Sequence, residues 1–183
     1  MTQSERIFRR YGRYFAAFLL TLCISSYAQA ASLAVDYLRG EGDVEGIKVA
    51  YQYYHHALTD YSDDLYWYVE TSVNFWEYGV ERQHDTNFIV ALSPVLHKTF
   101  FHRSQGRFYG EFGIGLSLLD DTTFAGKNVS THYQFEDRLG LGYEFGEDHK
   151  YRLALRYFHY SNGGVKKPNP GLDFISLSFA MRF

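Results

Sequence analysis

Apolar and polar residues alternate one by one along most of the chain after residue 30, which is the period of β-strands. The alternation is strictest at the C-terminus, where the apolar positions are Ile175, Leu177, Phe179, Met181 and Phe183. Segments rich in Gly, Pro, Asn and Asp separate the alternating runs. The pattern predicts eight strands, over residues 33–39, 47–55, 65–77, 88–97, 108–118, 132–145, 151–161 and 173–183.

The two faces of these strands differ in chemistry. One face is continuously apolar, and the other carries small residues together with charged ones, namely Glu70, Glu111, Glu136, Arg138, Arg152 and Arg156. Gly113, Gly115, Gly140 and Gly142 share the polar face, where small residues relieve crowding in a narrow barrel. We therefore expect an all-β fold, an eight-stranded antiparallel transmembrane β-barrel with a salt-bridged interior plug and a lipid-facing wall. A periplasmic, lipocalin-like barrel is the alternative.

The first thirty residues have the pattern of a secretory signal peptide. Arg6, Arg9, Arg10 and Arg13 precede a short apolar stretch, and Ala28-Gln29-Ala30 is a small-residue cleavage site. We predict a cleaved signal peptide over 1–30 and a barrel over 31–183. Cleavage would remove Cys23, the only cysteine, so no internal disulfide is expected.

Composition and the C-terminus favour the bacterial outer membrane. The chain has 17 Tyr and 16 Phe, a content typical of barrels whose aromatic residues form girdles at the membrane interfaces. Trp76, Tyr78 and these girdles would serve a monomer or a dimer equally well. The C-terminal Phe183 resembles the signal read by the barrel-assembly machinery. After residue 30 the chain has fourteen basic and twenty acidic residues, a net charge of −6, which argues against a nucleic-acid partner.

Residues with hydrolytic chemistry lie at the end of the apolar face. His159 and Ser161 continue the parity of the apolar residues of 151–161, and Asp173 has that of 173–183. A serine hydroxyl needs a base within hydrogen-bond reach, and a carboxylate on the neighbouring strand would fix the histidine tautomer. Asn162 offers an amide donor, and Gly164 a backbone N–H, to a developing oxyanion. With the termini on the periplasmic side, strand 151–161 ends at the outer leaflet.

The segment from His159 to Asp173, including Gly163-Gly164 and Lys-Pro-Asn-x-Gly, resembles the lipid A 3-O-deacylase (PagL) family of outer-membrane hydrolases. The resemblance implies hydrolysis of the acyl ester at the 3-position of lipid A, the lipid of lipopolysaccharide. It implies His159 as the base, Ser161 as the nucleophile, and Asn162 and Gly164 as oxyanion contributors. The third member is usually a glutamate in this family. This sequence departs from that pattern, because it has Asp173 there, which is one methylene shorter.

Other readings of the sequence remain open. A non-enzymatic barrel acting in adhesion or envelope integrity would share the fold, and a phospholipid-directed acyl hydrolase would share the catalytic groups. We expect no metal and no cofactor, because adjacent strand residues such as His55 and His56 point to opposite faces. Lys166 and Lys167 could bind the phosphates of lipid A, or they could be two solvated lysines of a surface loop. The sequence leaves acyl-chain preference and oligomeric state open, a homodimer included.

Overall fold

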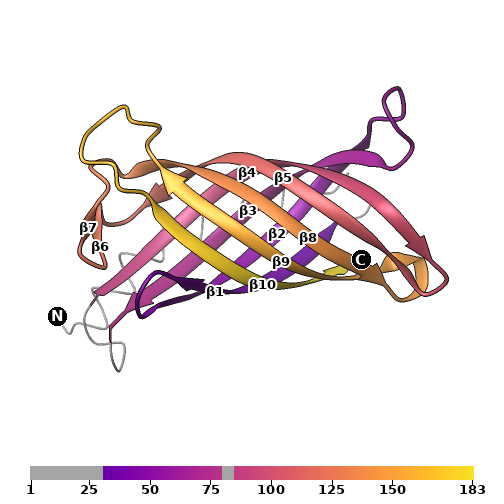
Figure 1. The fold of residues 1–183 in the computed structure, drawn as a ribbon, viewed down its shortest axis with the longest axis horizontal. Coiled ribbons are helices and arrows are strands. Elements are labelled where there is room, and N and C mark those ends of the chain that lie inside the picture. Colours follow the sequence, from indigo (N-terminus) through magenta and orange to yellow (C-terminus); the bar gives the residue numbers. More distant parts are fainter. Residues whose placement is uncertain (1–30, 80–84) are drawn as a thin grey trace.

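The eight predicted strands form the wall of a closed antiparallel barrel in the computed structural model, which describes residues 31–79 and 85–183 (Figure 1). The predicted signal peptide lies outside the described residues. The wall strands are β1 (Ser32–Gly40), β2 (Val44–Ala57), β3 (Leu65–Tyr78), β4 (Asp85–Arg103), β5 (Gly106–Leu119), β8 (Tyr133–Phe145), β9 (Tyr151–Ser161) and β10 (Leu172–Arg182). The predicted fold class is therefore confirmed.

Neighbours along the chain are neighbours in the wall, in the order β1-β10-β9-β8-β5-β4-β3-β2. The barrel closes where β1 pairs with β10, from Ser32 opposite Arg182 to Gly40 opposite Phe174. Closure gives each of the eight wall strands two hydrogen-bonded neighbours, so the described wall has no open edge. No helix within residues 31–79 and 85–183 is long and apolar enough to cross a membrane.

Three features of the wall and its connections were not predicted. The strand β4 continues to Arg103, past the predicted end at residue 97. A register shift between Thr99 and Phe101 interrupts the alternation, so the sequence pattern does not show the last part of the strand. Phe100 and Phe101 are consecutive and both exposed, which a regular strand does not allow. The connection between β5 and β8 also holds a short hairpin, β6 (Thr123–Phe124) paired with β7 (Lys127–Asn128). A short 3-10 turn, η2 (Glu147–His149), links β8 to β9.

The apolar face of the strands points outward, as the alternation predicts. Over the middle of β9 and β10 every second residue is exposed, and the residues between them are buried. This exposed set consists of Leu153, Leu155, Tyr157, Ile175, Leu177, Phe179 and Met181. A continuous wall of large apolar side chains on all strands suits a lipid environment and would be unfavourable in water.

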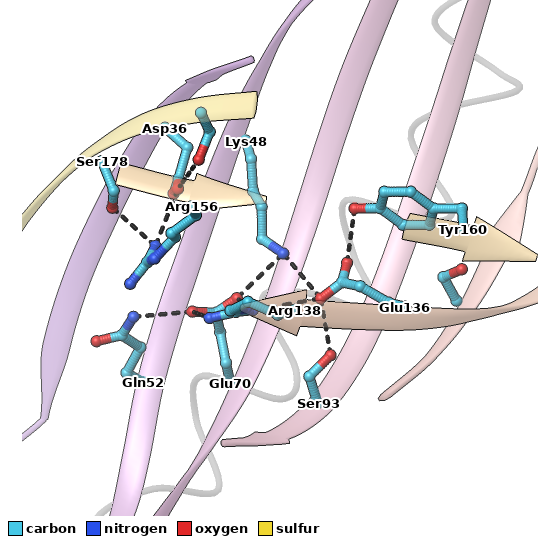
Figure 2. A network of polar contacts seen from close by, with 12 residues as sticks. Asp36, Lys48, Gln52, Glu70, Ser93, Glu136, Arg138, Arg156, Tyr160 and Ser178 are labelled. Carbon is cyan, nitrogen blue, oxygen red and sulfur yellow. Dashed lines mark hydrogen bonds and ion pairs between the residues drawn. The ribbon is translucent and has the colours of Figure 1, made fainter. Parts of the chain in front are cut away.

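Charged side chains fill the middle of the barrel and have one another as partners (Figure 2). The ammonium of Lys48 lies between Glu70 and Glu136, at 3.1 and 2.9 Å. Arg138 makes a two-pronged contact with Glu70. The predicted interior plug is therefore confirmed, with Lys48 as a further member.

A second part of the plug is centred on Arg156 of β9. Its guanidinium contacts Glu111 at 2.6 Å and Asp36 at 2.9 Å, and it also donates to Ser178. The glycines at 140 and 142 make room for such side chains, because a Cβ at Gly140 would lie 2.7 Å from Glu111 and one at Gly142 would lie 2.3 Å from Tyr109. The plug thus joins strands on opposite sides of the barrel.

At the end of the barrel away from Ser32 and Arg182, the interior becomes apolar. Trp76, Phe158, Tyr160, Phe174 and Phe124 of the hairpin form one buried cluster there with several aliphatic residues. Trp76 is only 1% exposed, so it belongs to the interior and is not one of the aromatic residues on the outer surface. Trp76 shares the parity of Glu70, which the alternation already places inside.

Replacing Arg138 with leucine should lower the free energy of unfolding by about 3–5 kcal/mol, because Glu70 would keep its charge inside the barrel with one fewer partner. Urea unfolding of the barrel in lipid would measure the change. Arg39→Leu is the control, since it breaks the exposed pair between Arg39 and Glu45 and should cost about 1 kcal/mol or less. Similar small values for both variants would contradict a structural role for the plug.

Candidate active site

His159 and Asp173 lie directly opposite each other on the neighbouring strands β9 and β10. The Nδ1 atom of His159 is 2.7 Å from Oδ1 of Asp173. A carboxylate accepts hydrogen bonds, so Nδ1 is the donor and Nε2 is left as the basic nitrogen. Both side chains are about one-third exposed, at 34% and 29%, on the outer wall of the barrel. The predicted base and acid are therefore in contact.

Ser161 follows His159 on the same face of β9 and is the last residue of that strand. Residues two apart on a strand have Cα atoms about 6.5 Å apart and side chains that point the same way. Since Asp173 engages Nδ1, the free Nε2 is the nitrogen available to the Ser161 hydroxyl. Within residues 31–79 and 85–183 no hydrogen bond joins Ser161 to His159, so the approach of the serine hydroxyl to Nε2, which nucleophilic catalysis requires, stays a prediction.

Two residues near His159 were not singled out from the sequence. Asp137 of β8 lies directly opposite His159 on the other side, so the imidazole has a carboxylate on each neighbouring strand. Tyr157 of β9 donates a 2.5 Å hydrogen bond to the same Oδ1 of Asp173 that His159 contacts. To find these two residues from the sequence, one would need the pairing register of β8, β9 and β10. The alternating pattern of a single strand does not give that register.

Asn162, one of the two predicted oxyanion contributors, organises the loop between β9 and β10. Its side chain is fully buried, and its amide donates to the carbonyls of Val129 and Lys166. Its Oδ1 accepts the N–H of Gly164, the other predicted contributor, at 2.9 Å. To act on an oxyanion, either residue would have to exchange one of these bonds. Their catalytic role stays a prediction.

Glycine is required at both ends of this loop. Gly164 and Gly171 have φ values of +78° and +73°, in the left-handed region that other residues rarely adopt. A Cβ at Gly171 would also lie 2.6 Å from Cε1 of His159. The backbone at Gly171 therefore packs against the imidazole, and a side chain there would push the base away from its place.

The segment around the β6–β7 hairpin braces the loop from the side. Lys127 donates to the carbonyl of Gly171, Ser130 donates to that of Pro168, and Val129 accepts from Asn162. Lys127 also forms an ion pair with Glu41 in the β1–β2 turn. Lys166 and Lys167 lie on the exposed side of the loop, where their contact with phosphates stays a prediction.

The catalytic candidates His159 and Asp173 lie on the outer surface of the barrel. A cavity of about 250 Å³ lies at the other end of the barrel, lined by residues that include His55, Arg107, Glu144 and Arg152, and no predicted site residue lines it. Over residues 31–79 and 85–183, no group of three or more His, Cys, Asp or Glu side chains could hold a metal ion. The arrangement is therefore suited to a substrate that lies against the barrel wall.

Sequence comparison identifies the family. Residues 45–182 match the sequence model of the family described as lipid A 3-O-deacylase (PagL). The chain belongs to the PagL family. The matched range contains His159, Ser161, Asp173 and the loop that joins β9 to β10.

Individual relatives agree with this assignment. The lipid A deacylase PagL of Bordetella bronchiseptica strain RB50 is 44% identical over 77 residues, which is 42% of either chain. That of Pseudomonas aeruginosa PAO1 is 33% identical over 116 residues, 62% of either chain. The matched parts therefore span less than two-thirds of either relative. The crystal structure of the outer membrane enzyme PagL shares the fold, with a TM-score of 0.65, 22% identity, and coverage of 84% of this chain and 99% of that one.

Asn162→Ala should loosen the loop over residues 162–171 while the barrel stays folded. The variant loses two donated hydrogen bonds and the acceptor for Gly164, each worth about 1–3 kcal/mol where a buried group is left unpaired. Hydrogen exchange measured by mass spectrometry should show faster exchange in this loop and unchanged exchange in β3 and β4. Lys167→Ala, at an exposed position of the same loop, is the control; equal exchange in both variants would contradict the organising role of Asn162.

Proposed function

We propose that this protein is a lipid A 3-O-deacylase of the bacterial outer membrane, which hydrolyses the ester-linked acyl chain at the 3-position of lipid A. The observation that carries the proposal is the contact between His159 and Asp173 beside Ser161, on the outer wall of a barrel that belongs to this family. The named relatives are lipid A deacylases, which gives the substrate class.

The reaction that fits these residues is acyl transfer to serine followed by hydrolysis. Nε2 of His159 takes the proton of Ser161 as the hydroxyl oxygen attacks the ester carbonyl, while Asp173 holds Nδ1–H and stabilises the imidazolium. The tetrahedral intermediate then collapses, and the sugar hydroxyl leaves with the proton that His159 returns. Water, activated by the same histidine, releases the fatty acid from Ser161.

The membrane position of the site follows from its place on the barrel. His159 and Ser161 lie at the end of β9 opposite to Ser32 and Arg182, on the face that carries the exposed apolar residues. With both termini on the periplasmic side, the site lies at the outer leaflet, where lipopolysaccharide resides. An acyl chain lying along the wall would bring its ester to Ser161.

Assembly into the membrane is the remaining part of this proposal. Phe183 is 67% exposed and continues the outward parity of Met181 and Phe179. We assign this terminal aromatic residue to recognition by the barrel-assembly machinery, after export directed by residues 1–30. The alternating strand β10, which ends at Arg182 next to Phe183, supports this assignment.

Lipid A from cells that produce the chain should lose one ester-linked acyl group, detected by mass spectrometry. Ser161→Ala and His159→Ala should abolish the change, because they remove the nucleophile and the base, and losses of about 10³-fold or more are typical for such groups. Asp173→Asn should reduce the rate strongly, whereas Asp137→Asn, the matched change on the other side of His159, should have a smaller effect.

Each variant must first be shown to reach the outer membrane in its folded, heat-modifiable form. Unchanged lipid A with folded wild-type protein would refute the deacylase. Release of fatty acid from phospholipid under the same conditions would instead support the phospholipid-directed alternative.

Leu155→Arg tests the membrane-facing wall. Leu155 is 60% exposed near the middle of β9, so an arginine there would place a charge in the hydrocarbon layer and lower folding stability by about 2–4 kcal/mol. Folding titrations into lipid vesicles would measure this, with Leu155→Phe as an apolar control near wild type. An arginine variant as stable as the control would indicate that water, rather than lipid, contacts the wall.

A further inference from the structure

Tyr157 occupies an unusual place for a wall residue, because its hydroxyl contacts a catalytic candidate. The hydroxyl donates to Oδ1 of Asp173 at 2.5 Å, and Nδ1 of His159 contacts the same oxygen at 2.7 Å. The side chain is 46% exposed and belongs to the outward row of β9, two residues before His159. One carboxylate oxygen thus accepts two hydrogen bonds from the neighbouring strand.

The strand register explains how the tyrosine reaches this oxygen. Asp173 is directly opposite His159, and Tyr157 is directly opposite Ile175. Tyr157 and Asp173 are therefore diagonal neighbours, about 7 Å apart at Cα, a distance that an aromatic side chain can span. In a lipid-facing row, an unpaired phenol hydroxyl would raise the free energy of the folded protein. The hydrogen bond is therefore favourable for both Tyr157 and Asp173.

The contact also bears on which carboxylate His159 uses. Asp137 on β8 and Asp173 on β10 are both directly opposite His159, so register alone does not distinguish them. The hydroxyl of Tyr157 binds Asp173, which limits rotation of that short side chain and keeps Oδ1 pointing toward the imidazole. With Nδ1 held on the β10 side, Nε2 keeps a single orientation relative to Ser161.

We propose that Tyr157 is a positioning residue, whose hydroxyl fixes Asp173 and, through it, the tautomer and ring orientation of His159. The role acts through another residue, so it differs from contact with the reacting atoms. Its kinetic consequences rest on the proposed deacylase function, whereas its effect on the imidazole does not.

The kinetic test is a double-mutant cycle on purified barrel in lipid micelles with lipid A as substrate. Tyr157→Phe keeps the ring and should lower kcat about tenfold, the scale of one hydrogen bond to a charged group, with KM changed less than about twofold. In an Asp173→Asn background the same change should have little further effect, because the two residues act as one unit. Tyr37→Phe, a similarly exposed wall tyrosine at 44%, is the matched control and should match wild type.

The second readout is independent of activity. In nitrogen-15 NMR spectra, the Nδ1–H of His159 should report a strong hydrogen bond in wild type and in Tyr37→Phe, and a weakened one in Tyr157→Phe. If no variant deacylates lipid A, the deacylase proposal fails and this spectrum still decides the positioning role. An unchanged His159 signal, a rise in KM without a fall in kcat, or an equal effect of Tyr157→Phe with and without Asp173 would each overturn the proposal.

Discussion

Burial of charge inside a narrow barrel is the constraint on which the rest of the structure depends. The wall closes around a space that side chains fill, so Lys48, Glu70, Arg138 and Arg156 must find partners among themselves and their neighbours. Those partners come from strands on opposite sides of the barrel. The ion pairs therefore connect the strands of the wall from the inside. The outer face does not need polar contacts to stabilise the fold.

The candidate site depends on this interior through strand β9. Arg156, Phe158 and Tyr160 anchor the strand in the plug and in the apolar cluster, and the residues between them, Tyr157 and His159, point outward. Tyr160 is itself bound to Glu136 at 2.8 Å. A strand held this firmly on its inner side presents its outer side chains in a defined geometry. The loop that follows is held in turn by Asn162 and by the segment around the β6–β7 hairpin.

Much of this architecture follows from alternation along single strands. The parity of each position predicted the eight strands, the inward charges and the outward placement of His159, Ser161 and Asp173. Errors arose where a feature depends on more than one strand. The bulge near Thr99 hid the end of β4, and the hairpin β6–β7 is too short to show a period. Tyr157 and Asp137 acquire their places only through register.

Because side chains on β9 and β10 alternate between the two faces, neighbouring residues of the same strand evolve under different constraints. Odd-numbered positions from 153 to 161 and from 173 to 181 meet the surroundings, and even-numbered ones meet the interior. Apolar substitutions at the odd positions leave the plug undisturbed, so the surface that faces the surroundings can change while the interior is conserved. A mutant library restricted to apolar substitutions at the odd positions outside the candidate site would vary the outer surface at little cost in assembly.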